Sequence, residues 1–67
     1  MNIIINGTQT DVPSNTLLLA VLEEQSVANA KGVAIAVNNT VIQRQNWETF
    51  TLKESDSILI IRATQGG

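Results

Sequence analysis

The chain has 67 residues and a net charge of −2. It contains no cysteine and no histidine, which excludes disulfides and thiolate nucleophiles and removes the usual general acid or base near neutral pH. We therefore expect one small domain, residues 1–67, with no room for an enclosed active site, no catalytic residue, no bound metal and no cofactor of its own.

The charge distribution and the apolar runs exclude two classes of partner. Lys31, Arg44, Lys53 and Arg62 are scattered along the chain, so the basic patch expected of a nucleic-acid-binding protein is missing. The longest apolar run, residues 17–22, is far shorter than the roughly 20 residues that span a membrane, and no basic signal-peptide start is present. We expect a soluble, cytoplasmic protein that binds neither nucleic acid nor membrane.

The chain begins with a pattern typical of a β-hairpin. Residues 1–6 are rich in isoleucine and end at Asn6-Gly7, a dipeptide that favours a two-residue hairpin turn. Residues 8–12 then read as the returning strand, and Pro13 closes it because proline has no N–H to donate.

A helix is predicted next. The side-chain oxygens of Ser14, Asn15 and Thr16 are candidate caps, so we expect the helix to begin near Thr16, and Gly32 is a candidate for the left-handed residue that ends it. The buried face is left open between two apolar stripes, Leu17, Ala20 and Val21 or Leu18, Val21 and Leu22.

The second half begins with another hairpin. Residues 33–37 alternate bulky residues with alanine, Asn38-Asn39 is a turn, and residues 40–43 are the partner strand. Residues 45–50 then read as a turn or short helical loop, in which Trp47 and Phe50 are more simply explained as anchors in the core than as a binding platform.

The chain closes with a strand and a tail. Residues 51–52 form a brief strand, residues 53–56 a polar turn, and residues 57–63 a strand that is apolar on both faces and so belongs at the centre of a sheet. Residues 63–67 should form a flexible tail.

The element order is similar to that of the β-grasp, or ubiquitin-like, fold. It predicts an α+β domain in which one main helix packs on one face of a mixed sheet of four to five strands. The resemblance places the first and last strands side by side and parallel in the middle of the sheet.

Gly66 and Gly67 carry the chemistry. Two residues without a Cβ suit a tail, with Gln65, that enters a narrow channel of a partner enzyme, so that the partner reaches the Gly67 carboxylate. An ionised carboxylate is a poor electrophile and needs a leaving group such as AMP. A sulfur nucleophile could then displace AMP and leave a thiocarboxylate on Gly67, with no catalytic side chain in this chain.

From residue 34 onwards the sequence resembles the ThiS family of thiamine-biosynthesis sulfur carriers. A hydrophobic strand, an Asn turn, Val-Ile-x-Arg-x-x-Trp, a polar Asp turn, an Ile-rich strand and Gly-Gly make up the family pattern. It is met by Val37, Asn38, Val41, Ile42, Arg44, Trp47, Leu52, Asp56, Ile58, Ile60, Gly66 and Gly67.

The resemblance implies three partners. An E1-like, ThiF-like adenylyltransferase would use ATP to adenylate Gly67, a cysteine-based donor would supply sulfur, and a ThiG-like thiazole synthase would consume the thiocarboxylate. One alternative is a carrier like the molybdopterin synthase small subunit, which is usually longer and lacks the Arg-x-x-Trp of Arg44 and Trp47. Another is a ubiquitin-like interaction module whose tail is idle.

One helix covers only one face of a sheet, so part of the last strand faces away from it. We expect Leu59 and Ile61, or else Ile58 and Ile60, to be exposed there, and we take Leu59 and Ile61 as the candidate partner surface. Arg44 is left open between a solvated charge and a partner of Glu48. Arg62, Glu54 and Asp56 are better explained by ordinary turn and strand-end chemistry than by partner contacts.

Overall fold

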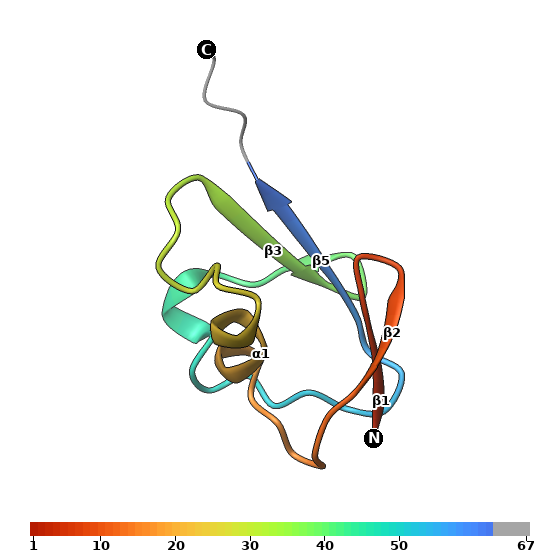
Figure 1. The fold of residues 1–67 in the computed structure, drawn as a ribbon. Helices are drawn as coiled ribbons and strands as arrows, with labels where there is room; N and C mark the ends of the chain where they lie inside the picture. Colours follow the sequence, from red (N-terminus) through yellow and green to blue (C-terminus); the bar gives the residue numbers. More distant parts are fainter. Residues whose placement is uncertain (63–67) are drawn as a thin grey trace.

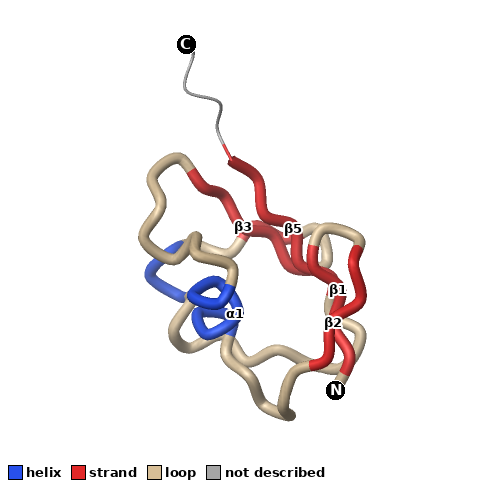
Figure 2. The backbone as a smooth tube through the Cα atoms, in the orientation of Figure 1, coloured by secondary structure: helices blue, strands red, loops and turns tan. Residues whose placement is uncertain are grey.

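The computed structural model describes residues 1–62, in which a five-stranded sheet has a helix packed on one face (Figure 1 and Figure 2). The strands are β1 (Asn2–Ile5), β2 (Thr8–Asp11), β3 (Val33–Val37), β4 (Thr40–Val41) and β5 (Ser57–Arg62). The helix is α1 (Leu18–Glu24), and a 3₁₀ turn, η1 (Arg44–Asn46), lies in the loop after β4. The predicted α+β architecture of the β-grasp type is confirmed.

The strand order is β2-β1-β5-β3-β4. At the centre β1 and β5 run parallel, with Ile4 opposite Ser57 and Ile5 opposite Ile58, whereas the other neighbouring pairs are antiparallel. The predicted parallel pair in the middle is therefore correct. β5 takes the central place because its run of apolar residues serves both faces of the sheet.

Both hairpins close with the two-residue turns that the sequence predicts. Asn6 and Gly7 have φ angles of 47° and 85°, and Asn38 and Asn39 have φ angles of 50° and 71°. Two consecutive residues with positive φ are the signature of a type I′ turn, whose twist matches that of the strands. Asparagine and glycine reach this conformation at low cost, so these turns set the register of each hairpin.

The helix begins later than predicted, and for a reason outside its own sequence. Its N-cap is Leu17, which makes no side-chain capping bond, and the Thr16 hydroxyl donates instead to the Pro13 carbonyl at 2.6 Å. The N–H of Leu18 donates to the Phe50 carbonyl at 2.8 Å, and that of Leu19 to the Trp47 carbonyl at 3.1 Å. The free N–H groups of the first turn are thus capped by a distant loop.

The helix also ends earlier than predicted. Ser26, with φ of 61°, takes the left-handed place that we expected at Gly32. Its N–H donates to Glu23 and the N–H of Val27 donates to Leu22, both at 3.0 Å, which is the Schellman pattern. Leu22 and Val27, the positions whose hydrophobic contact often accompanies this motif, are both fully buried in the same core cluster. Gly32 also has a positive φ, but it lies in the loop before β3.

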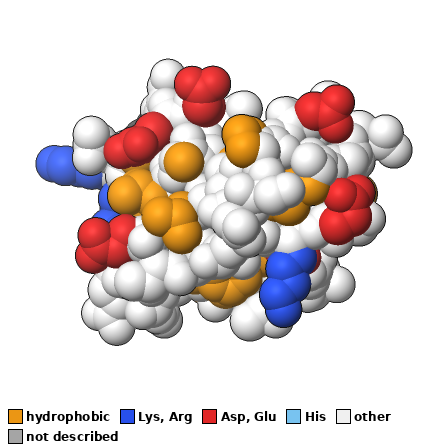
Figure 3. Space-filling model, turned by 90° about the horizontal axis from the view of Figure 1, so that it is seen from below, with side chains coloured by type: hydrophobic (Ala, Val, Ile, Leu, Met, Phe, Trp, Pro, Cys, Tyr) orange, Lys and Arg blue, Asp and Glu red, His pale blue; other side chains and the backbone are white. Residues whose placement is uncertain are grey.

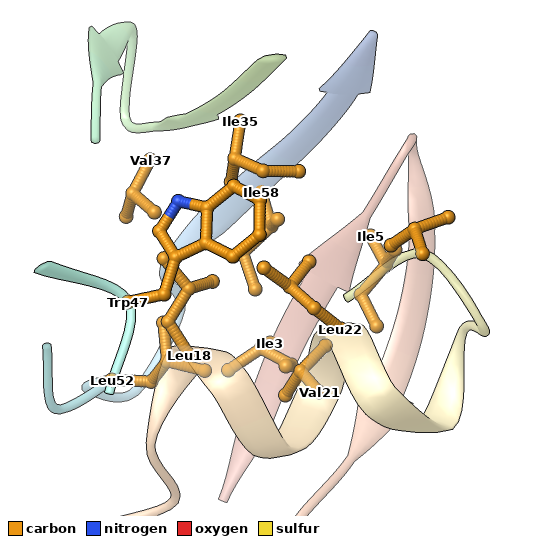
Figure 4. Close-up of a cluster of buried hydrophobic side chains, with 11 residues drawn as sticks. Ile3, Ile5, Leu18, Val21, Leu22, Ile35, Val37, Trp47, Leu52 and Ile58 are labelled. Carbon is orange, nitrogen blue, oxygen red and sulfur yellow. The ribbon is translucent and has the colours of Figure 1, made fainter. Parts of the chain in front are cut away.

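The core lies between α1 and the sheet. Figure 4 shows Leu18, Val21 and Leu22 pointing from α1 towards strand side chains, which settles which helical stripe is buried. Leu17, from the other stripe, is 39% exposed. Trp47 is buried in this core, which confirms its predicted role as an anchor, and Phe50 packs against the core from its edge.

Asp56 ties the end of β3 to the start of β5. Its two carboxylate oxygens accept hydrogen bonds from the Asn38 side-chain amide at 2.9 Å and from the Lys53 N–H at 2.8 Å. The Asn38 side-chain oxygen in turn accepts from the Ser57 N–H at 3.0 Å. Asp56 is buried, and both of its carboxylate oxygens are hydrogen-bonded within the fold. This agrees with the prediction that Asp56 serves the turn and not a partner contact.

Candidate functional site

The strand that leads to the predicted reactive end is held on one side only at its last residues. β1 pairs with β5 at Ser57 and Ile58, and the Asn6 side-chain oxygen accepts the Ile60 N–H at 2.8 Å, one step beyond the ladder. From there β3 is the neighbour of β5 up to Arg62, the last described residue. The C-terminal end of β5 thus projects beyond β1 (Figure 1).

An apolar patch covers the sheet face that α1 leaves free. Residues directly opposite in an antiparallel pair share a face, and Ala36 lies opposite both Leu59 and Val41 while Ala34 lies opposite Ile61. Leu59, Ile61 and Val41, which we call the apolar patch, are 48%, 47% and 63% exposed. Ala36 between two of them is only 7% exposed, because the larger side chains on either side cover it.

Arg44 forms a clamp that neither interpretation of the sequence describes. Its guanidinium donates to the carbonyls of Ala28 and Ala30 at 2.7 and 2.8 Å, and its central carbon lies 4.5 Å from the centroid of the Trp47 ring. The indole N–H of Trp47 donates to the Ile42 carbonyl at 2.9 Å. The guanidinium is therefore neither a freely solvated charge nor a partner of Glu48. It holds the segment before β3 against the loop that follows β4.

A comparison with protein-family models identifies the family of this chain. The ThiS family model matches residues 3–67. The chain belongs to the ThiS family.

Two solved structures of the same kind support this assignment. The crystal structure of a thiamine biosynthesis protein (ThiS) from Geobacter metallireducens is similar over 100% of both chains, with a TM-score of 0.83 and 26% identity. A solution structure of a thiamine biosynthesis protein from the same organism covers 100% of this chain and 88% of its own, with a TM-score of 0.78 and 26% identity. No significant match was found among curated proteins.

Membership of the ThiS family confirms the resemblance and supports the coarse assignment to sulfur carriage in thiamine biosynthesis. The family match extends over Gln65, Gly66 and Gly67, but these residues lie outside the described part of the chain, so their roles stay predictions. Leu59 and Ile61 face away from α1, as expected, and their role as a partner surface also stays a prediction.

Residues 1–62 carry neither a metal-binding cluster nor a membrane-spanning helix. Within this range no group of three or more His, Cys, Asp or Glu side chains is placed to hold a metal ion. No helix within it has both the length and the apolar character needed to cross a membrane.

Val41 and Asn6 belong to the site although the sequence analysis did not place them there. The sequence analysis assigns Val41 to the partner strand, residues 40–43, and to the family pattern, but its position opposite Ala36 makes it the most exposed member of the apolar patch. Counting residues across the Asn38-Asn39 turn would have found it. Asn6 was treated only as a turn residue, and nothing in the sequence indicates that its side chain would reach Ile60.

Proposed function

We propose that this ThiS-family protein carries sulfur for thiamine biosynthesis on the carboxyl group of Gly67. The observation that carries the proposal is that the family match runs to residue 67, where the sequence ends in Gly66-Gly67 just after the central strand β5. The proposed protein is a co-substrate, so it needs no catalytic side chain.

The chemistry proceeds in two steps on partner enzymes. An E1-like adenylyltransferase directs the Gly67 carboxylate against the α-phosphate of ATP, which forms the acyl-adenylate and releases pyrophosphate. The cysteine-based donor carries the sulfur as a persulfide, and a second thiol releases it as hydrosulfide by forming a disulfide with the donor. The hydrosulfide then attacks the carbonyl carbon. The new C–S bond replaces the C–O bond to AMP, and the thiocarboxylate remains for a thiazole synthase in the cytoplasm.

The position of the apolar patch supports docking next to the reactive end. Leu59 and Ile61 lie on β5 itself, and Arg62 follows them directly. Five residues follow Arg62, and a chain of five residues spans at most about 17 Å. A partner that binds the patch would therefore hold its catalytic centre within reach of Gly67. At protein interfaces a few residues that are fully buried near the centre carry most of the binding energy.

Intact-protein mass spectrometry tests the carrier proposal. We expect the chain, incubated with the adenylyltransferase, ATP and a sulfide donor, to exchange one oxygen for one sulfur at Gly67. A variant lacking Gly67 should stay unmodified, because its terminal carboxylate lies one residue short of the reacting position. If the full chain gains no sulfur while a control ThiS protein does, the idle-tail interaction module becomes the better explanation.

Single aspartate substitutions test the patch. We expect Leu59→Asp and Ile61→Asp each to raise the KM for the carrier in adenylation about tenfold or more, because a charge would be buried at the interface. Leu17→Asp is the matched control, since Leu17 is also an exposed leucine but lies at the start of α1. An unchanged KM in both patch variants would exclude the patch as the docking surface. The proposal that Gly67 carries sulfur would still stand, because mass spectrometry tests it separately.

A further inference from the structure

A groove runs between α1 and the edge strand β2, on the helix side of the sheet. Its volume is about 390 Å³. The buried side chains of Ile5 and Val21 lie at its floor, and the exposed residues Asp11 and Glu24 lie at its rim. Val12 and Ala20 add apolar surface to its wall. The groove shares no residue with the apolar patch.

The edge of the sheet beside this groove offers unpaired backbone groups. Met1 and Val12 exchange two hydrogen bonds, at 2.7 and 2.8 Å, so they form a hydrogen-bonded pair of the antiparallel ladder. Such pairs alternate along a ladder, which makes Ile3–Thr10 and Ile5–Thr8 the next bonded pairs. The N–H and C=O groups of Gln9 and Asp11 therefore point outwards, and within residues 1–62 neither N–H has another partner.

An exposed edge of this kind pairs readily with an added strand. Every second side chain of that strand would point towards α1 and into the groove, where apolar groups meet Ile5 and Val21. The side chains between them would lie on the other face, beside Asp11, which shares that face with Asn2. Glu24 places a second carboxylate at the rim of the groove.

The charges select the occupant. Lys31, Arg44, Lys53 and Arg62 are the only basic side chains of the sequence, and none lines the groove. The Met1 ammonium close by donates to the Val12 carbonyl at 2.7 Å. Pairing with β2 of a second copy would bring like charges together, because both edges carry Asp11. A strand with basic side chains is favoured instead. Seen from below, the molecule shows apolar side chains with acidic and basic side chains around them (Figure 3).

We infer that β2 and the groove form a second docking site, for an extended segment of a partner protein in which apolar and basic residues alternate. The segment adds a sixth strand to the sheet and places its apolar side chains in the groove. This site does not depend on Gly67, so it allows the carrier to stay attached to one partner while its carboxyl group reacts on another.

A titration of the full chain with a blocked hexapeptide that alternates valine and lysine tests the inference. Amide shifts of the ¹⁵N-labelled protein should be largest at Gln9, Asp11 and Ala20, and exchange of the Gln9 and Asp11 amides should slow as the new hydrogen bonds form. A hexapeptide that alternates valine and glutamate should leave the spectrum unchanged, because its negative side chains would lie beside Asp11 and be repelled by it.

Three variants locate the binding. We expect Asp11→Lys to weaken binding about tenfold or more, because the basic side chains of the segment lie beside Asp11, whereas Glu23→Lys, a like charge change on α1 and outside the groove, should have little effect. Gln9→Pro removes an outward N–H and leaves the pairing with β1 intact, so it should also weaken binding while circular dichroism confirms the fold.

Three results would overturn the inference. The first is a response centred on the amides of Leu59 and Ile61 instead of β2. The second is an equal loss in the Glu23→Lys and Asp11→Lys variants, which would mean diffuse charge attraction. The third is concentration-dependent dimerisation of the free chain through β2, which would assign this edge to a second copy. None of these results would bear on sulfur transfer to Gly67.

Discussion

Ile58 and Leu59 are neighbours in β5 and have side chains of equal size, yet they serve different faces of the sheet. Ile58 is 1% exposed among core residues that include Leu18, Leu22 and Trp47, whereas Leu59 is 48% exposed on the face that α1 leaves free. Successive side chains of a strand point to opposite faces, so one apolar run supplies both surfaces.

The two faces differ in what covers them. The helix, the Schellman turn and the loop after β4 cover the first face. The side chains that they place against it are nearly or fully buried: Leu18, Val21, Leu22, Val27 and Trp47. On the second face the apolar patch shields Ala36, and its own three side chains stay exposed. Burial is the main source of hydrophobic stabilisation, so the first face holds the fold together, whereas the second leaves apolar surface exposed.

The sharpest test of this comparison replaces each neighbour in turn. We expect Ile58→Ala to lower the free energy of unfolding by about 2–5 kcal/mol, because it leaves a cavity in a packed core. Leu59→Ala should lower it by less than about 1 kcal/mol, because its side chain is half in water already. Urea unfolding monitored by circular dichroism measures both. Similar losses at the two positions would mean that the exposed face also stabilises the fold.

Much of this division is readable from the sequence, because it depends on local patterns. The Asn6-Gly7 and Asn38-Asn39 turns fix both hairpins, and the uninterrupted apolar run of β5 indicates a central strand. The alternation within β5 then predicts that Leu59 and Ile61 share a face. The pairing of β1 with β5 needed the resemblance to the β-grasp, since contacts so distant in sequence leave no periodic signal.

The ends of α1 could not be predicted, because their partners lie elsewhere in the chain. The N–H of Leu18 is satisfied by Phe50, more than thirty residues later, so the local candidate caps were not used. At the other end Ser26 accepts a conformation that is more usual for glycine. The bonds from Arg44 to two backbone carbonyls have the same character, since backbone acceptors carry no signature in a sequence.

Arg44→Lys tests how the loops beside the covered face are held. A lysine keeps the charge but cannot reach both carbonyls in a fork or stack its plane on Trp47. Because Arg44 is exposed to solvent, we expect a modest loss of about 1 kcal/mol in the free energy of unfolding. Thermal and urea unfolding measure the loss. Lys31→Arg is the control and should change little, so an equal effect of both would contradict the clamp.

Ser26→Gly should give the smallest change in the free energy of unfolding. Ser26 lies at the end of α1, on the face of the sheet that the helix covers. Glycine removes the cost of the left-handed conformation but gains freedom in the unfolded chain, so we expect a net stabilisation of about 0.5 kcal/mol. Ser57→Gly is the matched control: Ser57 lies in an extended strand, and the same substitution there should destabilise the protein. If the KM for adenylation stays constant while Ser26→Gly raises the unfolding midpoint, then the covered face can be strengthened without disturbing the apolar patch. A changed KM would mean that a substitution at the end of α1 alters the apolar patch. The two faces would then not be independent.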